Sequence, residues 1–198
     1  MKIIIASNNQ GKIQEIKKLI QEAGIDNVKL YSLNDLKYTD EIEEYGKTYY
    51  INALIKAQTL AKKYPKYIVI ADDSGISVES LNGNPGVYSA RYGENEAGYK
   101  ENQNLTNNKL LLQELNDSSN RLAEFKAVIC VIKPNQEPHF FSGTLRGQIA
   151  TTICEDKGFG YDPIFLYKNK FLSQMTVEEK NKISHRGEAL KKVIKYLK

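Results

Sequence analysis

The sequence predicts an α/β protein with a central mixed β-sheet flanked by helices, and two observations lead to this fold class. Short apolar runs alternate with segments of helical periodicity in the early part of the chain, which is typical of strands joined by helices. Two longer strand-like runs, residues 122–132 and 138–153, bracket a turn at residues 134–137 and predict an antiparallel hairpin. Parallel and antiparallel strands together predict a mixed sheet.

The first elements are a strand, a helix and a strand. Residues 2–6 and 28–31 are apolar enough to be strands, and Gly24 is a natural end for the helix between them. The helix is predicted from apolar residues that recur at helical spacing, namely Ile13, Ile16, Leu19, Ile20 and Ala23. No internal repeat interrupts this order.

A second helix is expected over residues 47–64, with Pro65 after it. Its apolar side is predicted to carry Ile51, Leu54, Ile55 and Gln58, with Asn52 and Lys56 on the neighbouring face. A buried strand at residues 67–71, a helix within 94–115 and a terminal amphipathic helix that opens at 184–187 complete the expected elements.

Composition limits the classes of function. The 198 residues, 41% of them hydrophobic, suit one two-lobed domain over residues 1–198. The net charge of +4 is mild and the lysines are spread out, so binding to nucleic acid is not indicated and a polyanionic small molecule explains the charge equally well. Cys130 and Cys154 have no metal-type spacing, and the longest apolar run is too short for a membrane span. We therefore expect a reduced, cytoplasmic protein without a membrane partner.

Two adjacent carboxylates, Asp72 and Asp73, stand where the strand at 67–71 is expected to end. Paired carboxylates at a sheet terminus need a cation or hydrogen-bond donors, and a metal ion or a reacting water would satisfy them. The competing interpretation is an ordinary polar turn. Two further specialised loops, at residues 81–86 and 89–93, follow at once and favour a functional site.

A polar turn separates the first strand from the first helix. Such a junction directs backbone N–H groups and the positive helix end toward one point, where an anion binds well. The spacing is not that of a Walker loop, and a well-capped helix is the structural alternative. The predicted phosphate-binding residues are Ser7, Asn8, Asn9, Gln10, Gly11 and Lys12.

Two unusual stretches lie in the last quarter of the chain. In residues 158–163 two glycines flank Phe159, so that Phe159 or Tyr161 is able to stack on a flat ligand or, alternatively, to fill the core beneath a turn. His185 and Arg186 open a helix at its positive end, where each cation costs about 0.3–1 kcal/mol. A functional site explains this, as does a neutral histidine that only packs.

Five stretches in this order resemble the inosine triphosphate pyrophosphatase family, whose members hydrolyse non-standard purine nucleoside triphosphates such as ITP, dITP and XTP. The resemblance implies a two-lobed α/β fold with the active cleft between the lobes, and a homodimer. It implies attack of water at the α-phosphorus to give the monophosphate and pyrophosphate. The matching stretches are residues 7–12, the segment 43–46 with Asn52, Ala53 and Lys56, residues 71–93, residues 158–163, and residues 184–189 behind Lys180.

The resemblance also implies roles for single residues. Mg²⁺, or alternatively Mn²⁺, would be held by Glu43 and Asp73, and Asp73 would also accept the proton of the attacking water. Lys12, Lys56 and Lys180 would clamp the triphosphate. Because neighbours in an extended chain point to opposite sides, Asp72 and Asp73 are not expected to line one cleft.

Base selection is implied to lie in the other lobe. Phe159 would stack on the purine while Asp162, His185 and Arg186 contact its edge, since a 6-oxo acceptor pairs with donors that clash with the amino group of adenine. No residue indicates how guanine is rejected. The predicted substrate-binding set is completed by Ser74, Arg91, Gly160 and Tyr161.

One departure from the family pattern concerns the first loop, which reads Ser7-Asn8-Asn9 where the family has Thr-Gly-Asn. Asn tolerates a left-handed backbone, so we expect the loop geometry to be kept. Two competing functions remain: a related pyrophosphatase that acts on modified pyrimidines or nucleotide sugars, and a nucleotide-binding module without turnover. The paired-carboxylate site argues against the second.

Overall fold

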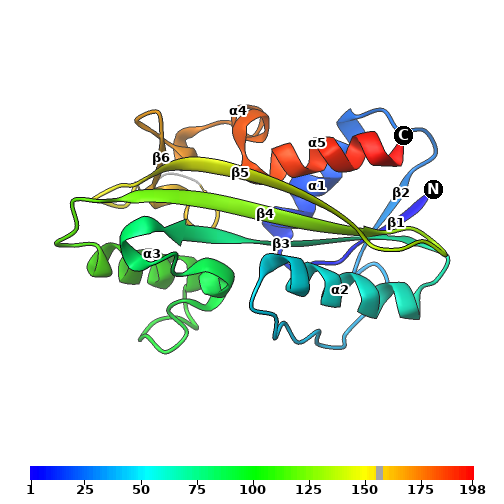
Figure 1. Cartoon of the computed structure of the whole chain (residues 1–198), viewed down its shortest axis with the longest axis horizontal. Helices are drawn as coiled ribbons and strands as arrows, with labels where there is room; N and C mark the ends of the chain where they lie inside the picture. The colour runs from blue at the N-terminus through cyan, green and yellow to red at the C-terminus, as the bar shows by residue number, and fades with distance from the viewer. Residues whose placement is uncertain (155–157) are drawn as a thin grey trace. The chain divides into compact units, whose positions relative to one another are not determined.

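The computed structural model describes residues 1–154 and 158–198. The described residues form one mixed sheet with strand order β2-β1-β3-β4-β5-β6-β7, flanked by helices (Figure 1). The α/β mixed sheet predicted from the sequence is confirmed, because β1 pairs in parallel with β2 and β3 while β6 pairs antiparallel with β5 and β7. The strands are β1 Lys2–Ile5, β2 Lys29–Ser32, β3 Ile68–Val78, β4 Leu122–Ile132, β5 His139–Ile149, β6 Phe165–Tyr167 and β7 Lys170–Phe171. The helices are α1 Gln10–Glu22, α2 Tyr49–Lys63, α3 Gln103–Glu114, α4 Val177–Ile183 and α5 His185–Leu197, with short 3₁₀ helices η1 Glu79–Leu81, η2 Gly86–Arg91, η3 Asp162–Ile164 and η4 Leu172–Gln174.

The chain divides into two compact units, each built from separated segments. The first unit comprises Met1–Asp73, Ala127–Gly143 and His185–Lys198, and the second comprises Ser74–Lys126 and Thr144–Ser184. Strands β3, β4 and β5 contribute residues to both. Each unit has a hydrophobic core of its own.

The core of the first unit follows from strand alternation. Alternate residues of β1, β3 and β4 point to one face of the sheet, where α1 and α5 cover them (Figure 1). Helix α2 lies on the other face. The covered side chains are Ile3, Ile5, Ile68, Ile70, Ala127, Ile129 and Val131 from the strands, and Ile13, Ile16, Ile20, Ala189, Leu190, Val193 and Leu197 from the helices.

The core of the second unit is built from α3 and the other halves of the long strands. Leu111 and Leu115 pack with Ile76 and Val78 of β3 and with residues of β4 and β5. Phe165 stacks at a tilt on Phe125, with ring centroids 4.7 Å apart. The tight loop predicted at residues 81–86 is present, with Asn82 and Gly83 at positive φ.

The end of one strand and the buried face of one helix were predicted wrongly. Strand β3 does not end before Asp72 but continues to Val78. Both carboxylates are tolerated within the sheet because each has a charged partner, described below. Helix α2 buries Asn52 and Lys56 together with Tyr49, Ala53, Ala57 and Leu60, whereas Ile51 is 44% exposed. The buried face of α2 thus includes polar side chains that have hydrogen-bond partners, and it differs from the apolar face that periodicity predicted.

Helix α4 was not predicted, although the sequence carries its start signal. Thr176 Oγ1 accepts from the backbone N–H of Glu179 at 3.1 Å, and Glu179 Oε2 accepts from the N–H of Thr176 at 2.8 Å. This reciprocal pair is a capping box, which Thr-x-x-Glu indicates from sequence alone.

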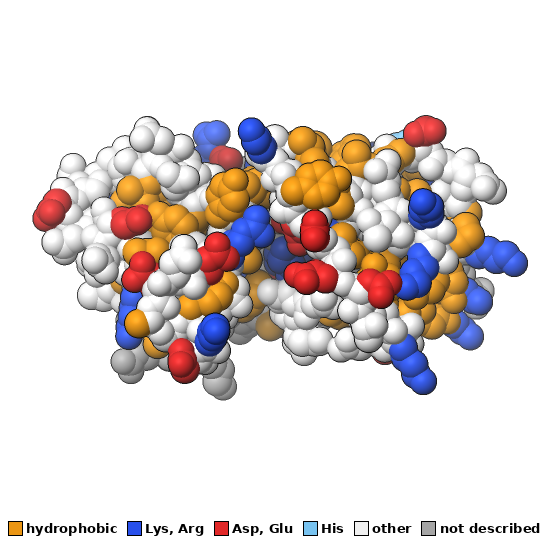
Figure 2. All heavy atoms as spheres, turned by 90° about the horizontal axis from the view of Figure 1, so that it is seen from below, with side chains coloured by type: hydrophobic (Ala, Val, Ile, Leu, Met, Phe, Trp, Pro, Cys, Tyr) orange, Lys and Arg blue, Asp and Glu red, His pale blue; other side chains and the backbone are white. Residues whose placement is uncertain are grey.

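The surface carries both signs of charge. On the face drawn in Figure 2, acidic and basic side chains both occur, with apolar side chains exposed between them. Among the described residues no helix combines the length and the apolar character needed to span a membrane.

Candidate active site

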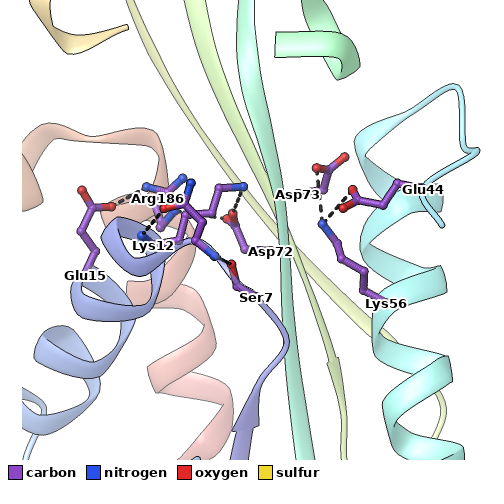
Figure 3. A network of polar contacts seen from close by, with 9 residues as sticks. Ser7, Lys12, Glu15, Glu44, Lys56, Asp72, Asp73 and Arg186 are labelled. Atoms are coloured by element: carbon purple, nitrogen blue, oxygen red, sulfur yellow. Dashed lines mark hydrogen bonds and ion pairs between the residues drawn. The ribbon is translucent and has the colours of Figure 1, made fainter. Parts of the chain in front are cut away.

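Asp72 and Asp73 point to opposite faces of β3, as Figure 3 shows. Asp72 has the same alternation as Ile68 and Ile70, so it faces α1 and α5. Asp73 has the opposite alternation and faces α2. The expectation that the two carboxylates do not share one site is therefore confirmed, and each has its own set of charged partners.

Asp72 is the centre of a buried ion-pair network. Its Oδ2 lies 2.8 Å from Lys12 Nζ and its Oδ1 lies 3.3 Å from Arg186 Nε, and the side chain of Asp72 is 0% exposed. Arg186 also contacts Glu15 through Nη1. Burial alone would raise the pKa of Asp72, but the charges of Arg186 and Lys12 outweigh it and hold that pKa well below its usual range.

Asp73 lies in a less compensated environment on the α2 face. Its Oδ1 is 3.6 Å from Lys56 Nζ, and Lys56 donates at 2.9 Å to Glu44 Oε2. The other oxygen, Oδ2, is buried and accepts no hydrogen bond from the described residues. Burial raises the pKa of Asp73, and the charge of Lys56 offsets this only in part. A carboxylate in such surroundings is suited to accept a proton or a cation.

The loop that carries Glu44 is held in place by α2. Asn52 Oδ1 accepts from the backbone N–H of Gly46 at 2.8 Å. A Cβ at residue 46 would lie 2.5 Å from that oxygen and 2.7 Å from Ile51 Cγ2, so only glycine fits. Gly46 and Asn52 therefore fix the acidic segment against the start of α2. The loop brings Glu44 to Lys56 and leaves Glu43, the predicted metal ligand, exposed.

The polar turn before α1 is a well-capped helix start. Asn9 Oδ1 accepts from the N–H of Lys12 at 3.2 Å, and Ser7 Oγ accepts from the N–H of Asn9 at 3.1 Å. Asn8 has no positive φ, so its tolerance of a left-handed backbone is not needed. Lys12 extends to Asp72 on one face of β3 while Lys56 lies on the other, so the structure does not gather these two lysines on one face.

Helix α5 begins against β5. A Cβ on Gly143 would lie 2.2 Å from the carbonyl oxygen of His185, so the helix start approaches the strand as closely as backbone allows. His185 and Arg186 are both buried and belong to the first unit, not to the second as expected for base selection. Arg186 is committed to Asp72 and Glu15, which does not support its role at the base edge.

The second unit brings together the Gly-Phe-Gly-Tyr-Asp stretch and Lys180. Asp162 Oδ2 accepts from Lys180 Nζ at 2.7 Å and from the backbone N–H of Phe159 at 3.2 Å. Lys180 Nζ also lies 5.6 Å from the centroid of the Phe159 ring. Lys180, predicted at the triphosphate, is therefore placed with the two residues predicted at the base.

The two aromatic residues of this stretch have different environments. Tyr161 is buried in the core of the second unit and its hydroxyl donates to Ser89 O at 2.7 Å. Phe159 is only half-buried. Tyr161 thus fills the core, which does not support a substrate contact by its ring, and Phe159 is the ring left for stacking.

Three further predicted residues, Ser74, Arg91 and Gly160, are partly exposed. Ser74 follows Asp73 in β3 and is partly exposed, Gly160 is in the left-handed region with φ +64°, and the Arg91 guanidinium lies 5.2 Å from the ring centroid of Tyr88. Within residues 1–154 and 158–198, no group of three or more His, Cys, Asp or Glu side chains is arranged to hold a metal ion.

The sequence model of the Ham1 family matches residues 3–196. The chain belongs to the Ham1 family. It is 47% identical over 195 residues to the dITP/XTP pyrophosphatase of Bacillus licheniformis, covering 96% of this chain and 95% of that relative. The Ham1 protein of Staphylococcus aureus superposes with a TM-score of 0.84 at 38% identity, and that of Coxiella burnetii with 0.86 at 33%, each covering 100% of this chain and 98% of the other. The family resemblance inferred from the motifs is confirmed.

For this Ham1-family chain, several polar residues around the predicted site were not found from sequence. Glu15 had no feature that distinguished it from other helix carboxylates, and Glu44 was part of a matching stretch but its contact with Lys56 was not predicted. Asn107 and Asn108, which hold two loops of the second unit, lie in a helix that the sequence marks only by its leucines. Their partners are distant in the chain, so local patterns carry no signal for them.

Proposed function

We propose that this Ham1-family protein hydrolyses non-standard purine nucleoside triphosphates, namely ITP, dITP and XTP, to the monophosphate and pyrophosphate. The family membership supports the proposal, since a relative 47% identical over almost the whole chain is named a dITP/XTP pyrophosphatase. The observation that carries it is Asp73, a buried carboxylate with one unpaired oxygen beside a lysine.

In this proposal Asp73 accepts the proton of the attacking water. The oxygen of the water bonds to the α-phosphorus, the α–β anhydride bond breaks, and pyrophosphate leaves. Burial raises the pKa of Asp73 toward the pH at which the enzyme works, which makes the carboxylate a better base than an exposed aspartate. Lys56 stabilises the ionised form of Asp73 and the negative charge of the substrate.

A divalent cation fits the residues around Asp73. The buried Oδ2 of Asp73 accepts no hydrogen bond from the described residues. Glu44, which follows Glu43 in the loop, accepts from Lys56, the lysine beside Asp73. Mg²⁺ prefers oxygen ligands and needs only one or two carboxylates when phosphates supply others. We propose Asp73 and Glu43 as its ligands, with Glu44 as the second candidate from the loop. When bound, Mg²⁺ would neutralise phosphate charge; Mn²⁺ offers the same chemistry.

The second unit would recognise the base. Phe159 presents the half-buried ring for stacking, and Asp162 with Lys180 offers an acceptor and a donor beside it. Contacts of Lys12 with phosphate and of His185 and Arg186 with the base stay predictions, since Lys12 and Arg186 are paired with Asp72 and His185 is buried. A homodimer and a cytoplasmic location also stay part of the proposal.

One assay tests the reaction. The protein is incubated with ITP, XTP, GTP or ATP and Mg²⁺, and pyrophosphate is separated from orthophosphate. We expect pyrophosphate, a strong preference for ITP and XTP, and a loss of a hundredfold or more in rate for Asp73→Asn, about what a general base supplies. Release of orthophosphate, or equal turnover of ATP, would overturn the proposal. Binding of ITP without turnover would instead indicate a nucleotide-binding module.

A further inference from the structure

Helix α3 carries two adjacent asparagines in its interior that are almost fully buried. Asn107 is 3% exposed and Asn108 is 2% exposed. Asparagine is a poor helix former, and a buried carboxamide costs free energy unless it is hydrogen-bonded. Leucines of the same helix fill the core beside them. The two amides therefore need an explanation other than helix stability or apolar packing.

Asn107 holds the loop 89–93, which comprises the end of η2 and the two residues that follow it. Its Oδ1 accepts from the backbone N–H of Gly93 at 2.7 Å, and its Nδ2 donates to Ser89 O at 3.2 Å and to Ala90 O at 3.1 Å. One carboxamide thus replaces the backbone partners that this loop lacks. The loop 89–93 is tied to α3 at both ends.

Asn108 holds the loop that carries Phe159. Its Nδ2 donates at 3.1 Å to the carbonyl oxygen of Gly160, a residue in the left-handed region with φ +64°. Its Oδ1 is buried and accepts no hydrogen bond from the described residues. Half of the carboxamide is thus left unsatisfied, which an apolar side chain of the same shape would avoid. Asn108 costs stability in order to hold Gly160.

The two asparagines are linked through Tyr161 in one hydrogen-bond network. The Tyr161 hydroxyl donates to Ser89 O at 2.7 Å, and this same carbonyl accepts from Asn107. The chain from Gly160 to Tyr161 then connects the loop 89–93 back to Asn108. Glycines on both sides of Phe159 give this stretch wide conformational freedom. The hydrogen-bond network restricts that freedom before any ligand binds.

We propose that Asn108, supported by Asn107, is a positioning residue that presents the Phe159 ring for stacking and so contributes to base selectivity; this rests on the proposed function. Neither asparagine needs to touch the substrate. Fixing the loop in its binding conformation lowers the entropic cost of ordering it when the base binds. A loop held only by its own backbone would accept adenine and hypoxanthine more equally, because it could rearrange around either.

The test compares Asn108→Asp with Asn104→Asp, an exposed asparagine on the same helix. Aspartate keeps the shape of Asn108 but turns an oxygen toward Gly160 O. We expect KM for ITP to rise about three- to tenfold, the effect of one lost hydrogen bond, with kcat changed less than about twofold. The preference for ITP over ATP should fall, and Asn104→Asp should leave all values unchanged. Equal loss of kcat on both substrates with unchanged KM would mean a structural role and overturn the proposal.

A second variant and a second readout keep the test independent of folding and of substrate. Tyr161→Phe removes only the donor to Ser89 O and should lower the same selectivity in the same direction. Hydrogen exchange of a peptide over residues 158–166, measured without nucleotide, should be faster in Asn108→Asp and Tyr161→Phe than in the wild type. Unchanged exchange in both variants would overturn the proposal that this hydrogen-bond network holds the loop. Wild-type protein that releases no pyrophosphate from ITP would instead refute only the proposed function.

Discussion

The opposite placement of two neighbouring carboxylates predicts opposite outcomes for two isosteric substitutions. Asp72→Asn removes the charge from the buried network on the α1 and α5 face, whereas Asp73→Asn removes the charge from the α2 face. Each change replaces one oxygen by an amide nitrogen and keeps the side-chain volume. Each variant is therefore the matched control for the other.

The cost of Asp72→Asn is estimated from the partners it leaves behind. Removing one member of a buried ion pair costs about 3–5 kcal/mol, because the other charge stays buried without compensation. Glu15 still pairs with Arg186, whose side chain is 3% exposed, and the amide oxygen still faces one cation. We therefore expect the lower end, about 3 kcal/mol, which lowers Tm by about 6–12 °C in a chain of this length.

Asp73→Asn should act on the rate and not on the fold. Burial raises the pKa of Asp73, so the ionised carboxylate is less favourable in the folded state than in the unfolded one. The free energy of unfolding then falls as pH rises through the folded-state pKa, and the amide removes this loss. At neutral pH the variant should be as stable as the wild type or more stable, while pyrophosphate release is lost.

Thermal and urea unfolding at pH 7, followed by far-UV circular dichroism, measure both variants beside the wild type. Pyrophosphate release from ITP measures turnover at a temperature where all three are folded. A Tm of Asp72→Asn within about 2 °C of the wild type would refute the ion-pair role of Asp72. So would a greater destabilisation by Asp73→Asn than by Asp72→Asn.

Three further predictions concern the same unit. Lys56→Met removes the cation that lowers the pKa of Asp73, so the acid limb of the pH–rate profile should move to higher pH, as a kcat/KM titration would show; an unmoved limb would speak against the pairing. Gly46→Ala places a Cβ 2.5 Å from Asn52 Oδ1 and should cost about 1–3 kcal/mol of stability and lower the rate, whereas an active variant of wild-type Tm would show that the loop adapts. The low pKa of Asp72 gives stability that is present above the unfolded value near 4 and is lost as pH falls below it, so an acid titration by circular dichroism should be flatter in Asp72→Asn, and parallel curves would contradict this.

Much of the first unit was predictable because local pattern and tertiary structure agree there. The isoleucines of α1 recur at helical spacing and all three buried ones face the core. Strand alternation alone separated Asp72 from Asp73. The apolar rule failed at α2, where Lys56 and Asn52 are buried because a carboxylate and a glycine N–H from the preceding loop meet them.

What sequence could not predict depends on contacts between distant segments. The pairing of Lys180 with Asp162 joins residues 18 apart, and Asn108 reaches Gly160 across 52. Lys180 was predicted to contact phosphate from its place near a family motif. The motif carries no information on which carboxylate this lysine meets. A buried asparagine in a leucine-rich helix had no local feature that predicts its partner.

The order of synthesis has a consequence for how the first unit matures. Arg186 follows Asp72 by 114 residues, and α5 supplies part of the core that covers β1 and β3. Segments made early therefore wait on the ribosome for a late helix before their apolar face is covered and their carboxylates are neutralised. A nascent chain halted after Ser184 would expose that face, and quality-control proteases should degrade it rapidly even though the second unit has been made in full.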